Sequence, residues 1–245
     1  MKFFLAPMQG LTGYTVRNAF HHHFDYIDKY YTPFIPAAKR MNAKIKRDID
    51  PVNNDGITLI PQAMSIVADE VIDLHRQLVP YGYDEINVNL GCPSGTVVSK
   101  KRGSGILAYP DMLDSFLDEL YTKADFPVSI KTRVGFNDDE LWPRLIEIYS
   151  KNPISELTVH PRVQKDFYKN TPRMDDFAIA MQKINPDKTT LCYNGDITDT
   201  NSFNALTDCF PDIDEIMIGR GLFANPALIA ELKGISMDKA ELRER

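Results

Sequence analysis

The sequence has few cysteines and no long hydrophobic run, and each of these features excludes a class of protein. Three cysteines in 245 residues are too few for a disulfide framework, and their low, odd number favours a reducing cytoplasm. No apolar stretch reaches the ~18 residues that a membrane span requires. The N-terminus also lacks a signal-peptide core and cleavage site. We therefore predict a cytoplasmic protein without a membrane segment.

Several motifs are missing as well. No CxxC or HExxH spacing occurs, so we predict that the chain holds no metal. No GxGxxG follows the first predicted strand, which argues against a doubly wound dinucleotide-binding sheet. The net charge of −6 argues against a protein that coats nucleic acid. Two basic segments, residues 39–47 and 100–102, could still form a local basic face, the alternative being an ordinary solvated surface.

What the sequence does contain is a regular alternation of strand-like and helix-like runs. Such alternation favours a parallel sheet, and eight units in 245 residues match an α/β fold of the (β/α)8 TIM-barrel type. We predict one barrel domain over residues 1–235 and a short charged tail over residues 236–245. The predicted strands are residues 2–6, 26–31, 58–62, 85–90, 128–133, 156–160, 189–193 and 215–218. The clearest helices are residues 67–79, 110–123, 139–150, 174–184, 201–209 and 222–232.

The fourth predicted strand ends in a turn that carries a cysteine. Alternation along residues 85–90 turns Asn87 and Asn89 to the face opposite the apolar side chains, where buried amides are costly unless they bind something. Cys92 follows on the turn. It could act as a nucleophile, which requires a lowered pKa, or as a proton donor, which an ordinary thiol with a pKa near 8.5 suits. Cys192 and Cys209 are interpreted as buried and inert.

Polar side chains also gather at the ends of the next two strands, where TIM barrels carry their chemistry. Lys131 and Arg133 share one face of the fifth strand, and His160 and Arg162 share one face of the sixth. Lys131 either forms a buried ion pair with a carboxylate such as Asp84 or Asp196, or it faces an electron-rich ring such as a reduced flavin. Beside these cations, His160 is interpreted as a donor to a cofactor or substrate.

Glycine-containing turns follow the last two strands. They are Asn194-Gly195-Asp196 and Gly219-Arg220-Gly221. Turns at these positions form the common phosphate site of TIM barrels, where backbone N–H groups hold the anion. Glycines in ordinary turns are the alternative. The presence of Arg220 favours the phosphate site.

Taken together, these residues resemble the tRNA-dihydrouridine synthases, which are flavin enzymes with a TIM-barrel catalytic domain. The matching pieces occur in the family's order and run from residue 6 to residue 221. They are Ala6-Pro7-Met8, Gln62, Asn89-Leu90-Gly91-Cys92-Pro93, Gly103-Ser104-Gly105, Lys131-Thr132-Arg133, His160-Pro161-Arg162 with Tyr168, Asn194-Gly195-Asp196 and Gly219-Arg220-Gly221.

The resemblance implies the reduction of a uridine in tRNA to 5,6-dihydrouridine. It implies that FMN, reduced by NADPH or NADH, delivers a hydride to C6 of the base and that Cys92 gives the proton to C5. It also implies that Asn89, Arg133 and Arg162 bind the substrate. The residues that would hold FMN are Pro7, Met8, Gln9, Gln62, Lys131, His160, Asn194, Gly195, Asp196, Gly219 and Arg220.

The sequence departs from the family at its end. A helical domain that grips tRNA usually follows the barrel, whereas this sequence stops at Arg245, as expected of a truncated or minimal form. The departure motivates an alternative, a flavin-dependent TIM-barrel oxidoreductase that acts on a small molecule such as a pyrimidine or an enone. A third reading is an inactive barrel that binds RNA or a protein. The sequence makes no prediction of the oligomeric state or of which uridine is modified.

Overall fold

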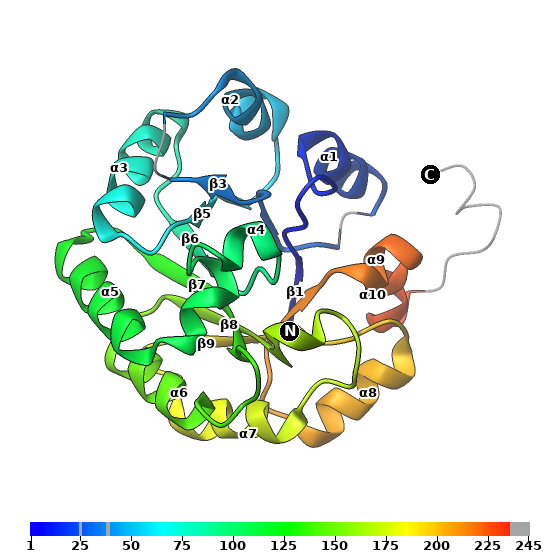
Figure 1. The fold of residues 1–245 in the computed structure, drawn as a ribbon. Coiled ribbons are helices and arrows are strands. Elements are labelled where there is room, and N and C mark those ends of the chain that lie inside the picture. Colours follow the sequence, from blue (N-terminus) through cyan, green and yellow to red (C-terminus); the bar gives the residue numbers. More distant parts are fainter. Residues whose placement is uncertain (25, 38–39, 236–245) are drawn as a thin grey trace.

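A ring of parallel strands surrounded by helices forms the protein, as the computed structural model shows (Figure 1). The structure describes residues 1–24, 26–37 and 40–235. The TIM-barrel prediction is confirmed, whereas the predicted tail at residues 236–245 lies outside the described residues. The strands are β1 Lys2–Leu5, β2 Lys29–Tyr31, β3 Ile35–Pro36, β4 Leu59–Ile60, β5 Gln62–Met64, β6 Ile86–Leu90, β7 Val128–Gly135, β8 Glu156–Val163, β9 Thr190–Tyr193 and β10 Glu215–Ile218.

The third predicted strand is divided at Pro61 into β4 and β5. Pro61 carries no N–H, so the ladder of hydrogen bonds is interrupted at this residue. β4 pairs with β2, and β5 pairs with β6. This short segment therefore links β2 on one side to β6 on the other and closes the ring. The two-residue strand β3 pairs with β5 and was not predicted from the sequence.

All six predicted helices are present, and the last of them is divided in two. α9 ends before Asn225, whose extended backbone is favoured by the proline that follows it. α1, α2 and the single turn of α4 were not among the clearest helices predicted from the sequence. The helices are α1 Tyr14–His23, α2 Ala43–Ile49, α3 Ala68–Leu78, α4 Gly95–Val98, α5 Pro110–Lys123, α6 Trp142–Lys151, α7 Met174–Lys183, α8 Thr200–Cys209, α9 Arg220–Ala224 and α10 Leu228–Leu232.

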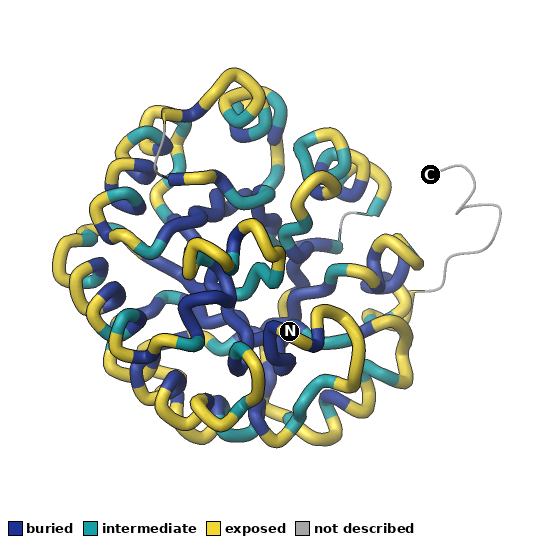
Figure 2. The backbone as a smooth tube through the Cα atoms, in the orientation of Figure 1, coloured by how far each residue is buried: buried dark blue, intermediate teal, exposed yellow. Residues whose placement is uncertain are grey.

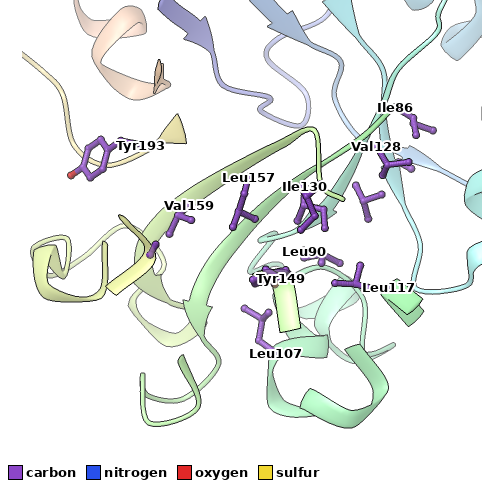
Figure 3. Packing of buried hydrophobic residues seen from close by; sticks show 14 of the residues in the cluster. Ile86, Leu90, Leu107, Leu117, Val128, Ile130, Tyr149, Leu157, Val159 and Tyr193 are labelled. Atoms are coloured by element: carbon purple, nitrogen blue, oxygen red, sulfur yellow. The ribbon is translucent and has the colours of Figure 1, made fainter. Parts of the chain in front are cut away.

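The main hydrophobic core lies between the strands and the surrounding helices, and Figure 2 shows the buried strands inside a more exposed outer ring. Figure 3 shows members of this core on β7 and β8, such as Ile130 and Leu157, with Leu117 of α5 and Tyr149 of α6 in the same cluster. These apolar residues occupy alternate positions on the strands. The residues between them, Lys131 among them, therefore face the interior of the barrel.

The barrel interior holds a second, smaller apolar cluster and a set of polar side chains. The apolar cluster includes Phe4, Tyr31 and Cys192. The Tyr31 hydroxyl donates to Glu156 at 2.7 Å, so this carboxylate is satisfied inside the barrel. Nowhere in the described part of the chain is a helix both long and apolar enough to cross a membrane.

Candidate active site

A cavity of about 520 Å³ opens at the C-terminal ends of the strands. Its size lies within the usual range of cofactor and ligand pockets. Every predicted site residue except Arg162 contributes to its lining. Those residues are Pro7, Met8, Gln9, Gln62, Asn89, Cys92, Lys131, Arg133, His160, Asn194, Gly195, Asp196, Gly219 and Arg220.

A chain of buried amides holds the turn that carries Cys92. The side-chain oxygen of Asn89 accepts from the backbone N–H groups of Gly91 and Cys92, at 3.1 and 2.8 Å. Its nitrogen donates to Gln62 at 2.7 Å, and Gln62 in turn donates to Asn87 at 2.8 Å. The inward amides are therefore satisfied within the protein, and Asn89 fixes the backbone at Cys92. Its contact with a substrate stays a prediction.

The thiol of Cys92 has the protonation state that a proton donor requires. Burial raises its pKa, and this effect outweighs the opposing influences of a backbone hydrogen bond and of the charges on Arg133 and Lys131. The thiol therefore stays neutral at pH 7. The same two cations would stabilise the thiolate that is left after a proton has been given up.

The backbone at Cys92 is also held from the opposite side by the loop that begins at Gly103. The N–H and hydroxyl of Ser104 donate to the Cys92 carbonyl at 3.1 and 2.9 Å. Gly103 has a φ of +55°, and a Cβ there would lie 2.7 Å from the Cys92 carbonyl oxygen. Only glycine therefore allows this close approach without moving the cysteine.

We expect Gly103→Ala to lower both stability and catalytic turnover, because the new methyl group pushes against Cys92. Gly82→Ala is a matched control, since Gly82 also has a positive φ, +86°, but no neighbouring atom lies within 4 Å of where its methyl group would be. The control should lose about 1 kcal/mol of unfolding free energy from its backbone alone. Gly103→Ala should lose about 2 kcal/mol or more and about 10-fold or more in turnover. Equal effects of the two variants in urea unfolding and activity assays would contradict this account.

Lys131 provides a cation inside the pocket without a carboxylate partner. Neither Asp84 nor Asp196 pairs with it, and no ion pair to Lys131 occurs among the residues that the structure describes. Burial and the charge of Arg133 lower the pKa of Lys131 to about 7. The ion-pair alternative from the sequence is therefore wrong for both of these carboxylates, and the amino group, about half of it protonated at pH 7, is free to face a ligand.

This buried cation makes stability depend on pH. The pKa of Lys131 is about 7 in the folded protein, against about 10.4 when unfolded. Below pH 7 both states are protonated and the folded state bears the full cost of the buried charge. Between pH 7 and about pH 10.4 the unfolded state binds more protons than the folded state, so the free energy of unfolding rises with pH. Lys131→Met should therefore stabilise the flavin-free protein by about 1–3 kcal/mol at pH 6. Urea unfolding should show a smaller gain at pH 9, and a gain that does not change with pH would contradict the assignment.

His160 is neutral and has a defined tautomer. Burial, together with the charges of Arg133, Lys131 and Arg162, holds the pKa of His160 well below its usual range. Its Nε2 lies 3.1 Å from Nη1 of Arg162. Because a guanidinium group only donates, Nε2 must accept and the proton must lie on Nδ1. His160 therefore has an N–H with which to bind an acceptor in the pocket.

Arg162 is buried and does not line the pocket, although alternation placed it on the same strand face as His160. It forms a two-pronged ion pair with Asp196, and its remaining donors bind the carbonyl groups of Lys169 and Asn170. Arg220 binds the same carboxylate at 2.5 Å from a more exposed position. Every nitrogen of Arg162 is thus engaged, and its predicted contact with substrate stays a prediction.

Arg133 lines the pocket, but its guanidinium group also binds protein. Its nitrogens donate to the carbonyl oxygens of Gly91, Val163 and Phe167, at 3.0, 2.9 and 2.6 Å. Arg133 therefore ties the cysteine turn to the loop after β8. Burial lowers the pKa of Arg133 to about 10, so the group remains a cation at neutral pH.

The pocket also has apolar lining residues that were not predicted from the sequence. Leu11, Phe34 and Phe167 contribute to the lining, and none belongs to a polar motif or a glycine turn. Cys209 was predicted to be buried and is exposed, because it is the last residue of α8. Cys192 is buried in the barrel interior, as predicted. Within the described residues, no group of His, Cys, Asp and Glu is arranged to hold a metal.

The fold is that of a TIM barrel, with a pocket at the C-terminal ends of its strands. Solved structures that share this fold include two from other enzymes. Morphinone reductase has a TM-score of 0.63 at 11% identity, covering 98% of this chain and 88% of its own. The 3-hexulose-6-phosphate synthase of Salmonella typhimurium has a TM-score of 0.58 at 14% identity, covering all of both chains.

The sequence comparisons identify the family. The family model described as dihydrouridine synthase (Dus) matches residues 4–244, so the chain belongs to the dihydrouridine synthase family, as its motifs predicted. The tRNA-dihydrouridine synthase B of Pasteurella multocida is 26% identical over 243 residues, which are 96% of this chain and 69% of that protein. The protein of the same name in Escherichia coli K12 is 30% identical over 174 residues, 71% of this chain and 53% of the relative. These matches span about half to two thirds of the relatives' lengths.

Proposed function

We propose that this chain reduces a uridine in tRNA to 5,6-dihydrouridine, with a flavin bound in the pocket. The observation that supports the proposal most directly is the neutral thiol of Cys92, which lines the same cavity as the amino group of Lys131, a group that is partly protonated at neutral pH. A proton donor and a buried cation around one cavity suit the transfer of a hydride and a proton to a ring. Membership of the dihydrouridine synthase family supplies the substrate class.

The donors that line the cavity fit a flavin mononucleotide. The cation of Lys131 and the Nδ1–H of His160 suit the carbonyl and ring nitrogen acceptors of an isoalloxazine. The exposed guanidinium group of Arg220 and the turn at Gly219 suit a single phosphate group. We propose FMN held by the predicted residues of the lining, with NADPH or NADH as the reductant.

In the proposed reaction, the protein supplies the proton and the geometry. A flavin held by Lys131, His160 and the turns at Asn194 and Gly219 would, in its reduced form, supply the hydride for C6 of the uracil ring. Cys92 then gives its proton to C5, and Lys131 and Arg133 stabilise the thiolate that remains. Asn89 keeps the cysteine turn in place through its two backbone contacts.

Binding of tRNA would require the target base to leave its stack, at a cost of a few kcal/mol. Exposed lysines and arginines near the pocket could offset this cost by contacting phosphates, which would make binding sensitive to salt. α2 exposes Lys44, Lys46 and Arg47, and the loop after α4 exposes Lys100 and Lys101. Both segments follow strands of the barrel and therefore lie toward the end that carries the pocket.

The decisive experiment combines a spectrum with an assay on RNA. The purified protein should show flavin absorbance, and denaturation should release FMN. Incubation with unmodified tRNA and NADPH or NADH should produce dihydrouridine, detected by nucleoside mass spectrometry. Comparable turnover of free uridine or another small pyrimidine would replace the proposal with the small-molecule alternative. A protein without flavin that oxidises neither reductant would support the inactive barrel instead.

A further inference from the structure

The loop between β8 and α7 has an unusual backbone. Phe167 and Asn170 have positive φ angles, +50° and +59°, and neither is a glycine. A positive φ is common enough for asparagine but is an outlier for a bulky side chain such as phenylalanine. Backbone strain of this kind costs free energy and persists only where the surrounding contacts enforce it, and it gathers at functional sites.

Two buried arginines enforce this conformation. Arg133 donates to the carbonyl oxygen of Phe167 at 2.6 Å, and Arg162 donates to that of Asn170 at 2.5 Å. The N–H of Phe167 donates to the carbonyl oxygen of Gln164 at 3.1 Å. The side chain of Gln164 in turn donates to the carbonyl oxygen of Pro93, beside the cysteine turn, at 3.0 Å. The loop is therefore fixed relative to Cys92.

The loop presents two aromatic rings at the rim of the pocket. Phe167 is 46% exposed and Tyr168 is 52% exposed, and both contribute to the lining. The Tyr168 ring has partners, since the guanidinium groups of Arg220 and Arg133 lie 4.9 and 5.7 Å from its centre. The Phe167 ring makes no aromatic or cation–π contact with any residue that the structure describes. A strained backbone thus holds an unstacked aromatic ring where a ligand would enter.

We propose that Phe167 stacks on a base of the RNA next to the nucleotide whose base enters the pocket. The inference rests on the proposed function and adds a binding residue to it. Extruding one base leaves its neighbours without a stacking partner, and an exposed aromatic side chain replaces that partner for any base. Because the backbone that carries the ring is already fixed, the loop loses little conformational freedom on binding.

Three substitutions of Phe167 separate stacking from folding. Phe167→Gly removes the ring and also removes the strain of the positive φ, so the loop keeps its conformation. Phe167→Leu keeps an apolar side chain without a planar face, and Phe167→Trp keeps a planar face. We expect dissociation constants for unmodified tRNA to rise about 5- to 100-fold for the glycine and leucine variants. The tryptophan variant should bind about as tightly as the wild type.

Two further measurements keep the test specific. The slope of the logarithm of the tRNA binding constant against the logarithm of the salt concentration should be the same in all three variants, because the ring contacts no phosphate. Val52→Ala is the control, since Val52 is an apolar side chain that is 86% exposed and lies outside the pocket lining. It should bind tRNA like the wild type. Thermal unfolding and flavin content, measured in parallel, should show that Phe167→Gly is folded.

The outcomes distinguish this inference from the proposed function. If the wild type forms dihydrouridine and Phe167→Gly binds tRNA as tightly, the stacking role is overturned while the function stands. Equal binding by the leucine and tryptophan variants would assign the ring to packing and would also overturn it. A wild-type protein that neither binds nor modifies tRNA would overturn both.

Discussion

Replacing Cys92 with alanine is expected to reduce the formation of dihydrouridine by about 10²- to 10⁴-fold, the usual contribution of a positioned general acid. The expectation follows from the location of the thiol in the pocket and from the burial that raises its pKa. Reduction of the bound flavin should continue, since it does not use this proton. Stopped-flow absorbance would measure flavin reduction and, separately, its reoxidation by tRNA.

Cys209→Ala is the matched control for this prediction. Cys209 is an exposed cysteine at the end of α8 and does not belong to the pocket lining. Its loss should leave both half-reactions unchanged. Cys92→Ser should remain far below the wild type, because a hydroxyl group is a much weaker acid than a thiol. If flavin reoxidation by tRNA were as fast in Cys92→Ala as in the wild type, Cys92 could not be the proton donor.

Replacing Arg162 with alanine is expected to lower the free energy of unfolding by about 3 kcal/mol. Arg162 is 1% exposed, and its loss leaves a partly buried Asp196 without its main partner. Although burial acts to raise it, the pKa of Asp196 lies below its usual value because of the hydrogen bonds and charge of Arg162 and the charge of Arg220. The loss should therefore be smaller at low pH, where Asp196 is protonated in both states.

Arg220 offers a comparison at the same carboxylate. It is 49% exposed, so Arg220→Ala should cost less than about 1 kcal/mol of stability. We expect it instead to weaken binding of FMN, measured by fluorescence titration of the flavin-free protein. Arg162→Lys should recover only part of the lost stability, because an ammonium group cannot bind a carboxylate through two parallel hydrogen bonds. Equal unfolding free energies for Arg162→Ala and Arg220→Ala would contradict the assigned difference in burial.

The sequence predicted those features of the fold and site that depend on local pattern. The alternation of apolar and polar residues along a strand determines which side chains face the barrel. It therefore placed Lys131 and His160 correctly, and the break after Leu90 placed Cys92 at the pocket. α1 and α2 were missed, although they complete the first β/α units of the ring.

The remaining features depend on contacts between residues far apart in the sequence. Alternation predicted that Arg162 shares a face with His160, but it could not predict that Asp196, 34 positions away, would hold the guanidinium group outside the pocket lining. The positive φ of Phe167 is likewise set by Arg133 from the preceding strand. No residue pattern marks a phenylalanine for such a conformation. The identity of the polar residues at the pocket could thus be predicted from the sequence, whereas the long-range hydrogen bonds that fix their positions could not.

The interruption of the third barrel strand at Pro61 has a consequence for motion. Only two residue pairs join β4 to β2, and only two join β5 to β6, whereas five pairs join β6 to β7. Amide protons along this seam should therefore exchange with deuterium sooner than those of β6 and β7, because local opening breaks fewer bonds there. The seam lies between the strand that leads to Phe34 and the strand that leads to Cys92. Opening at Pro61 would therefore act on the wall of the cavity between Phe34 and Cys92 while the rest of the ring stays folded, and the amide chain from Gln62 to Asn87 and Asn89 would oppose it.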